Sequence, residues 1–247
     1  MAVNRLVYVS IAAVAAILAA VSQRGGPEST EHVLALNWQP AFCETRPRTS
    51  ECRRLNDGET PNATRRLSLH GLWPQPRERA YCGVDDGVRR RDVAGEWSRL
   101  PEPGLDAETS IALSEAMPGV ASGLARHEWI KHGTCHGTDA DAYFDDALIV
   151  TAAVNGSPVG RLFADNIGRR VSASDVRAAF DAGFGDGAGA RVRIECVDDD
   201  GRKLIKELRI NLSGRIEPEA SVAELIRAAP PAAAGCAGGV VDPAGLQ

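Results

Sequence analysis

Lysine is scarce in this chain of 247 residues: Lys131, Lys203 and Lys206 are the only lysines among 28 Lys and Arg residues. The formal net charge of −5 argues against a protein that coats nucleic acid through overall positive charge. A small basic pocket on an acidic body is still allowed. Aromatic residues are few, at 5%, but 44% of the residues are apolar. That fraction is enough for a core and excludes disorder over most of the chain.

Charge is missing from residue 6 to residue 21, a run that follows a short basic start. The run is about 16 residues, and a membrane-spanning helix needs roughly 20. Small residues before Gln23 complete the pattern of a secretory signal peptide. We therefore expect a signal peptide over 1–22, a periplasmic or secreted domain over 23–247, and no stable membrane association after cleavage. An uncleaved membrane anchor is the alternative.

The six cysteines include no Cys-x-x-Cys pair, which argues against a zinc ribbon or a thioredoxin-type redox site. In an exported chain an even cysteine count predicts up to three disulfides. Six cysteines allow 15 pairings, and their spacing alone does not choose among them.

Hydrophobic patterns predict strands near both ends of the mature chain and helices between them. We expect strands over 32–38 and 66–70, a polar loop over 43–65, helices over 106–116, 122–132, 139–154 and 172–182, and a hairpin over 192–212. Gly71 and Pro74 should end the second strand, and the arginines at 89–91 should lie in a solvated loop. This order of elements favours a single α+β domain with packed helices on an antiparallel sheet.

Residues 126–136 hold a cluster of ionisable side chains, and as a helix they turn about 100° per residue. Four of them share one arc of that helix: His127, Lys131, Glu128 and His132, at about 0°, 40°, 100° and 140°. Trp129 and Ile130 lie on the far side, where they can anchor the helix in the core. A fifth group, His70, lies in a separate strand.

Two histidines on opposite sides of a reacting centre can act as base and acid near neutral pH. A lysine and a protonated histidine can neutralise charge that develops on a phosphorane. The combination suits in-line phosphoryl transfer within RNA, in which the 2′-OH attacks the adjacent phosphate. Such a reaction needs no metal or cofactor, and DNA is not cleaved because it lacks the 2′-OH.

Three other interpretations are open from the residues alone. The helix face can be solvated and held by salt bridges. A zinc hydrolase is weaker, because His127 and His132 are five apart whereas the zinc helix motif needs four. A nucleophilic Cys135 beside His136 is also weak, because a cysteine of an exported chain is expected to be bridged.

Two segments, Leu69–Pro74 and His127–Cys135, closely resemble the two active-site segments of the ribonuclease T2 family. Leu36–Cys43 is similar to the first strand and its exit in that family, most of all in its periplasmic bacterial members. The resemblance covers roughly residues 31–212. It implies an α+β fold with an antiparallel sheet. It also implies metal-independent RNA cleavage through a 2′,3′-cyclic phosphate with low base specificity.

The resemblance also implies a role for each matching residue. His132 takes the base role and His70 the acid role, and His127 binds the phosphate. Glu128 and Lys131 stabilise the pentacovalent state. Trp73 stacks on a base, with packing in the core as its alternative. The substrate is RNA, with no metal or cofactor, and we expect a monomer.

Gln75 departs from the family pattern, because many members carry an acidic residue directly after Trp-Pro. Base preference is therefore open. The resemblance further implies Cys82–Cys135 and Cys196–Cys236 bridges, which leaves Cys43 to pair with Cys52. A member that binds RNA without turnover is the rival function, and the presence of every acid and base position argues against it.

Overall fold

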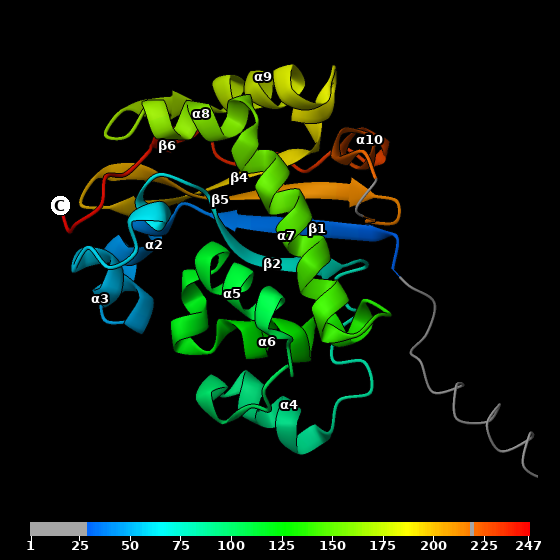
Figure 1. Cartoon of the computed structure of the whole chain (residues 1–247). Helices are drawn as coiled ribbons and strands as arrows, with labels where there is room; N and C mark the ends of the chain where they lie inside the picture. Colours follow the sequence, from blue (N-terminus) through cyan, green and yellow to red (C-terminus); the bar gives the residue numbers. More distant parts are fainter. Residues whose placement is uncertain (1–28, 218–219) are drawn as a thin grey trace, which may run out of the picture.

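The computed structural model describes residues 29–217 and 220–247 as an α+β fold (Figure 1). The signal peptide expected over 1–22 lies outside the described residues. The strands are β1 (Glu31–Asn37), β2 (Ser68–Pro74), β3 (Arg170–Ser172), β4 (Val192–Asp199), β5 (Arg202–Ser213) and β6 (Gly238–Val240). The α-helices are α2 (Gln39–Thr45), α3 (Ser50–Asn56), α4 (Asp86–Val93), α5 (Ala107–Ala116), α6 (Leu124–Lys131), α7 (Ala140–Gly156), α8 (Pro158–Asp165), α9 (Ala173–Phe184) and α10 (Val222–Ala228). Short 3-10 helices are η1 (Pro61–Thr64), η2 (Trp97–Arg99), η3 (Pro118–Ser122), η4 (Gly133–Cys135) and η5 (Ala188–Arg191).

The six strands form one mixed sheet in the order β2-β1-β5-β6-β3, with β4 paired to β5. All strand pairs are antiparallel except β5 with β6. Helices α8 and α9 lie on one side of the sheet, and α4, α5 and α6 gather beside β2 on the other (Figure 1). The predicted antiparallel α+β fold is therefore confirmed, with one short parallel pairing added.

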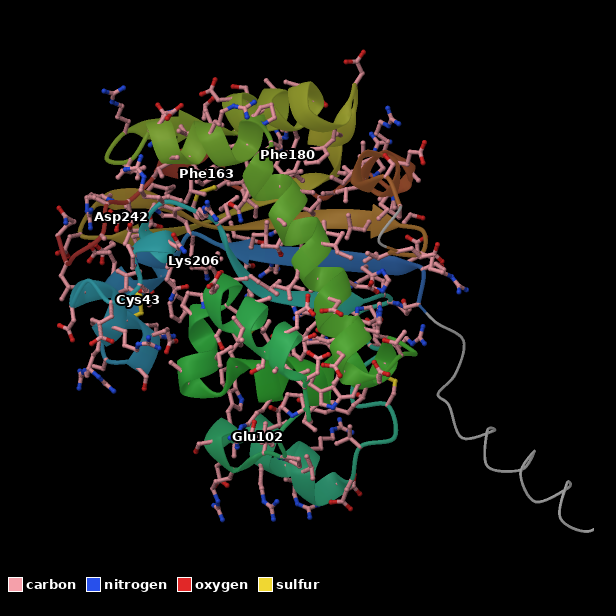
Figure 2. The ribbon with its side chains drawn as sticks, viewed as in Figure 1. Cys43, Glu102, Phe163, Phe180, Lys206 and Asp242 are labelled. Atoms are coloured by element: carbon pink, nitrogen blue, oxygen red, sulfur yellow. A yellow bond between two sulfur atoms is a disulfide. The ribbon has the colours of Figure 1, made fainter. Side chains whose placement is uncertain are left out.

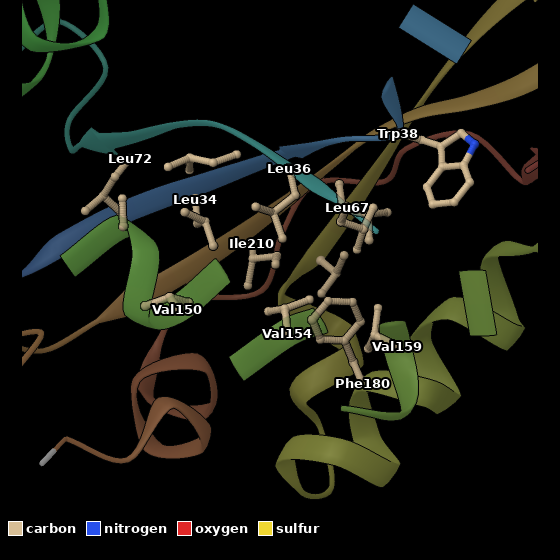
Figure 3. Close-up of a cluster of buried hydrophobic side chains, with 14 of the residues drawn as sticks. Leu34, Leu36, Trp38, Leu67, Leu72, Val150, Val154, Val159, Phe180 and Ile210 are labelled. Carbon is tan, nitrogen blue, oxygen red and sulfur yellow. The ribbon is translucent and has the colours of Figure 1, made fainter. Parts of the chain in front are cut away.

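Alternation along β1 places its two faces in different surroundings, because successive side chains of a strand point to opposite sides. Leu34 and Leu36 point into the main core, where they meet Val150 and Val154 of α7 (Figure 3). Phe180 of α9 lies in the same cluster. Figure 2 places Phe163 of α8 in the same layer above the sheet. The opposite face of the sheet is left for polar side chains.

That opposite face carries groups from three neighbouring strands. Ala35 of β1 lies opposite Gly71 of β2 on one side and opposite Arg209 of β5 on the other. Glu207 and Arg209 therefore share a face with Ala35, away from the core side chains Leu208 and Ile210. The β1–β2 register shifts between Ala35 and Leu36, and His70 lies at this irregularity.

The hairpin predicted over 192–212 is confirmed as β4 and β5. Lys206 of β5 is a polar residue among alternating apolar ones, and it lies at a β-bulge. Glu195 pairs with Glu207, and Cys196 pairs with Ile205, so Lys206 has no residue opposite it in β4. A bulge of this kind shifts the alternation by one residue. The backbone oxygen of Lys206 accepts a hydrogen bond from the backbone N–H of Trp38 (Figure 2 labels Lys206).

Three expectations from the sequence are wrong. The segment 43–65 is not a loop, because α3 and η1 lie within it. The arginines at 89–91 lie in α4, whose N-cap Asp85 accepts from the backbone N–H of Gly87 and Val88. This helix was missed because it has almost no apolar side chains to give a 3.6-residue period. Strand β2 does not stop at Gly71 but continues to Pro74.

The disulfides are Cys43–Cys52, Cys82–Cys135 and Cys196–Cys236, which confirms the expected pairing (Figure 2 labels Cys43). Each Cα–Cα distance, 5.2, 5.0 and 6.0 Å in that order, is normal for a bridge. The first ties α2 to α3. The second joins the loop after β2 to η4, directly beyond α6.

Within residues 29–217 and 220–247, no single helix has the length and hydropathy to cross a membrane, and only α7 and α8 taken together, with a 63° bend between them, pass that test.

His32 and His136 lie outside the candidate site and form a buried chain with Asp146. His136 Nε2 lies 2.8 Å from Asp146 Oδ2, and His136 Nδ1 lies 3.0 Å from His32 Nε2. If His136 donates to the carboxylate, its Nδ1 accepts from His32. His32 Nδ1 then has no partner among the described residues. A proton on His32 Nδ1 would leave these hydrogen bonds in place but would create a buried charged N–H group without a partner.

Replacing His32 with glutamine is expected to reduce the loss of stability in acid. Burial, with the charges of His136 and Arg79, lowers the pKa of His32 from 6.5 to about 3. Between these two pKa values, His32 is protonated in the unfolded chain and neutral in the folded chain. This contribution to stability is complete above pH 6.5 and is lost as the pH falls toward 3. One proton corresponds to about 1.4 kcal/mol per pH unit in the free energy of unfolding.

Urea unfolding of the wild type and H32Q between pH 6 and pH 4 measures that difference, and the other titrating groups cancel. Equal slopes of unfolding free energy against pH would show that His32 does not carry the effect.

Candidate active site

His70 enters the site from the bulged part of β2, with 29% of its side chain exposed. Its Nδ1 lies 2.7 Å from Glu207 Oε2 on β5, and its Nε2 lies 3.7 Å from Glu128 Oε1 on α6. Burial acts to lower the pKa of His70, but the hydrogen bond to Glu207 and the charges of Glu128 and Glu207 outweigh it and raise this pKa. His70 is therefore favoured in the protonated form.

Glu128 lies at the centre of the site, with only 1% of its side chain exposed. Its Oε2 accepts a hydrogen bond from Trp73 Nε1 at 2.9 Å. Its Oε1 lies between two imidazoles, 3.7 Å from His70 Nε2 and 3.8 Å from His127 Nε2. Burial raises the pKa of Glu128, against the opposing effects of those histidines and the Trp73 hydrogen bond.

His127 is held on two sides. Helix α6 begins after Gly123, whose φ of 85° is a left-handed conformation that glycine adopts without strain. One turn later, His127 Nδ1 meets Asp92 Oδ1 of α4 at 2.6 Å. The indole of Trp97 stacks on the His127 ring at 4.3 Å between centroids. The second oxygen of Asp92 accepts from Tyr81 at 2.7 Å, so the ring orientation of His127 is fixed.

His132 is the C-cap residue of α6 and has a different environment. Its ring lies 5.6 Å from the Trp73 ring and 6.3 Å from the His127 ring. No side-chain hydrogen bond to His132 is found within the described ranges. Burial, with the positive charges of Lys131, His127 and His70, lowers the pKa of His132 to about 3. His132 is therefore neutral at physiological pH, with a free nitrogen that can accept a proton.

Trp73 lies between the two histidines that differ in protonation. The His70 ring meets its edge at 5.3 Å, and the guanidinium of Arg209 lies 5.3 Å from its ring centre. A cavity of about 350 Å³ opens beside it. The cavity is lined by Val33, Trp73, Pro74, Gln75, Arg77, Lys131, His132 and Arg209. Its cationic rim suits an anionic ligand.

A model of the ribonuclease T2 family matches residues 30–220 of the chain. The chain belongs to the ribonuclease T2 family. Ribonuclease I of Escherichia coli is 38% identical over 186 residues, 67% of this chain and 69% of that protein. A probable ribonuclease of Haemophilus influenzae is 34% identical over 121 residues, 46% of this chain and 39% of that protein. The crystal structure of human RNase T2 aligns at 18% identity with a TM-score of 0.47, over 74% of this chain and 85% of that chain.

The structure of this T2-family ribonuclease brings the six predicted site residues together: His70, Trp73, His127, Glu128, Lys131 and His132. The first two come from β2 and the others from α6 and its C-cap. The helical arc that the spacing predicted is preserved, and the far side of α6 packs as expected, with Ile130 buried. Trp73 is half-buried and contacts both acid and base candidates, so neither free stacking nor core packing describes it fully.

Asp92, Glu207 and Arg209 also belong to the site of this ribonuclease, and sequence reasoning missed them. Glu207 and Arg209 alternate with Leu208 and Ile210 along β5, so their place on the non-core face could have been read from the period of two. Nothing in the local sequence marks Asp92, which lies in a polar helix. Its buried position, 3% exposed, follows only from packing.

His127, Glu128 and His132 each offer a donor atom, and these atoms lie within 4.8 Å of one another. Helical spacing therefore does not keep the two histidines apart, because α6 ends at Lys131 and His132 lies beyond it. His127 Nδ1 and Glu128 Oε2 are already occupied by Asp92 and Trp73. Catalysis without a metal stays a prediction for this family member.

Proposed function

We propose that this T2-family ribonuclease is a metal-independent endonuclease that cleaves single-stranded RNA by transphosphorylation. His132 Nε2 or Nδ1 removes the proton of the 2′-OH, and the oxygen attacks the adjacent phosphorus. The bond from phosphorus to the 5′ oxygen breaks, and His70 gives its proton to the departing oxygen. The products are a 2′,3′-cyclic phosphate and a free 5′-OH.

The observation that carries the proposal is the different surroundings of the two histidines beside Trp73: His70 is bonded to Glu207 and lies near Glu128, whereas no carboxylate among the described residues is bonded to His132. Carboxylates raise the pKa of His70, whereas burial and neighbouring cations lower the pKa of His132. An acid and a base that must act in the same turnover need this difference. Environment alone supplies it here, because both groups are imidazoles.

The remaining groups suit the pentacovalent intermediate. Lys131 lines the cavity beside His132 and supplies a positive charge for the phosphorane. His127, whose ring is held by Asp92, is proposed to bind a phosphate oxygen. Glu128 is held by Trp73 so that it separates the rings of His70 and His127. Trp73 is proposed to contact a base at the edge of the same cavity.

The substrate is proposed to be RNA and not DNA, because the reaction uses the 2′-OH as nucleophile. Three disulfides are consistent with an oxidising compartment, and we propose a periplasmic or secreted monomer that does not associate stably with membranes. The low base specificity implied by the family resemblance is part of this proposal.

Purified protein incubated with single-stranded RNA in excess EDTA tests the function. We expect full cleavage and 2′,3′-cyclic phosphate ends. The matched control is the same oligonucleotide with one 2′-deoxy residue, at which no cleavage should occur. Loss of cleavage in EDTA that zinc restores would replace the proposal with a metal-dependent hydrolase. Binding of RNA without cleavage would replace it with an RNA-binding protein.

A further inference from the structure

A buried carboxylate lies directly behind the proposed acid. Glu207 of β5 is 2% exposed, and its two oxygens have different partners. Oε2 meets His70 Nδ1 at 2.7 Å, and Oε1 accepts from Arg209 Nε at 2.6 Å. A buried charge is costly unless it is paired and hydrogen-bonded. Glu207 meets this condition only because a cation faces each of its oxygens.

We propose that Glu207 is a positioning residue for general acid catalysis, which fixes the His70 ring and holds the catalytic proton on it. The inference rests on the proposed function, because it assigns Glu207 to the acid of that reaction. A carboxylate can only accept, so Nδ1 of His70 must carry a hydrogen. This leaves Nε2, which lies 3.7 Å from Glu128 Oε1, as the nitrogen that delivers its proton to the 5′ oxygen.

Charged groups from two elements act on His70. From α6 comes Glu128, whose charge favours the protonated ring, and the same helix and its C-cap also carry His127, Lys131 and His132. From β5 come Glu207, which favours the protonated ring, and Arg209, which opposes it. The hydrogen bond that His70 donates to Glu207 is the largest of the effects that raise the pKa of His70. Removing the charge of Glu207 therefore removes the main support of the proton.

Arg209, which pairs with Glu207, also pairs with a glutamate of the neighbouring strand β4. Arg209 Nη1 lies 3.3 Å from Glu195 Oε1 on β4, and Glu195 also pairs with Arg193 at 2.5 Å. Glu195 does not contact His70, and 22% of its side chain is exposed. The chain thus offers two glutamates in one ionic row, only one of which touches the acid. Glu195 is a matched control.

His132 shows what an imidazole of this site does without a carboxylate. It shares the neighbour Trp73 with His70, but no acidic side chain is bonded to it in the described part of the chain. Its pKa is lowered to about 3 where that of His70 is raised. The acid role of His70 therefore depends on its carboxylates and not on burial.

The substitution Glu207→Gln tests the inference, because glutamine keeps the size and can still accept from Nδ1. We expect the pKa of His70, followed by NMR titration of labelled histidine, to fall by about 1–2 units. The alkaline limb of the pH profile of kcat should move down by the same amount. At pH values above that limb kcat should fall about 10- to 100-fold, with near-normal kcat in acid. E195Q should leave both measurements unchanged.

Glu207→Asp is the second variant, because it restores the charge at a greater distance. It should recover part of the alkaline activity, which a purely structural role of Glu207 would not explain. If E207Q does not fold, the titration of His70 in the wild type and in E207D still decides. A wild-type pKa of His70 at or below 6.5 overturns the inference, as does an E207Q profile that is lower at every pH but not shifted.

Failure of the inference and failure of the proposed function give different results. If the wild type does not cleave RNA, the function is wrong, while the NMR titration still measures the link between Glu207 and His70. If the wild type cleaves RNA and E207Q titrates like the wild type, the function stands and the role of Glu207 is wrong.

Discussion

Replacing His132 with alanine is expected to lower kcat for RNA cleavage by roughly 10²- to 10⁴-fold, the usual contribution of a positioned base. His70→Ala should have a loss of similar size because it removes the acid. Neither change should unfold the protein, because neither side chain belongs to the hydrophobic core. Steady-state cleavage of a single-stranded oligonucleotide, with circular dichroism to confirm the fold, measures both variants.

The two roles can be separated by the leaving group. A uridine 3′-phosphate ester of p-nitrophenol releases an anion that needs no proton, so the acid is dispensable for it. H70A should therefore recover to within about tenfold of the wild type on this ester, whereas H132A should not recover. The opposite result would exchange the two roles. H32Q is the control for loss of a buried histidine outside the site and should cleave both substrates normally.

If either alanine variant keeps near-normal kcat on RNA, the corresponding assignment is wrong. Persistence of activity in H132A would direct attention to His127 as the base. In that case Asp92 would orient a base and not a phosphate ligand.

The sequence predicted the site best where the chemistry is local. His127 and Glu128 are neighbours on α6 and His132 is its C-cap residue, so donor atoms of the three lie within 4.8 Å of one another. His70 was joined to them through motif resemblance, and the structure explains the contact through the bulge of β2 beside β1. The distance between Nε2 of His70 and Oε1 of Glu128, 3.7 Å, depends on that register and not on any local pattern.

The parts that could not be predicted depend on tertiary packing. Glu207 of β5 reaches His70 of β2 across β1, which pairs with both strands, so the contact depends on the order of strands in the sheet. Asp92 reaches His127 only because α4 packs on α6, and α4 lacks the apolar stripe that would reveal such packing. The carboxylate partners of both histidines were therefore missed, although these partners determine how each ring is oriented.

Those two missed carboxylates suggest how one set of imidazoles serves three purposes. His70 has Glu207 behind it and His127 has Asp92, and each ring is thereby held in one orientation. His132 has no such partner among residues 29–217 and 220–247. The proposed acid and the proposed phosphate ligand are thus fixed in orientation, and carboxylates raise the pKa of His70, whereas the pKa of the proposed base, His132, is lowered. We infer that the division of roles is set by the second side chain behind each histidine.

The substitution Gly71→Ala is expected to remove most of the RNA-cleaving activity, although it replaces no ionisable residue. A Cβ at residue 71 would lie 1.9 Å from Glu128 Oε2, 2.5 Å from its Cδ and 2.8 Å from Trp73 Nε1. Contacts this short force one side chain to move. Glu128 is buried and held by Trp73, so it has no open space to enter. Overpacking of this kind costs about 1–3 kcal/mol.

We expect G71A to lower Tm by roughly 2–12 °C, from that cost and the size of the domain. Its kcat should fall about 10²-fold, because Glu128 and Trp73 set the positions of His70 and His127. Gly156→Ala is the matched control, since a Cβ at residue 156 meets nothing within 4 Å. It should change neither Tm nor kcat appreciably.

A double-mutant cycle with Glu128→Ala identifies the cause. Alanine at residue 128 removes Oε2 and Cδ of Glu128, the two atoms closest to the added Cβ of residue 71. G71A should therefore cost little further stability in the E128A background, and the two changes should be strongly non-additive. Additive losses of stability would show that the backbone of β2, and not the Glu128 carboxylate, needs glycine at residue 71. In that case the role of Gly71 would lie in the strand and not in the placement of the active-site carboxylate.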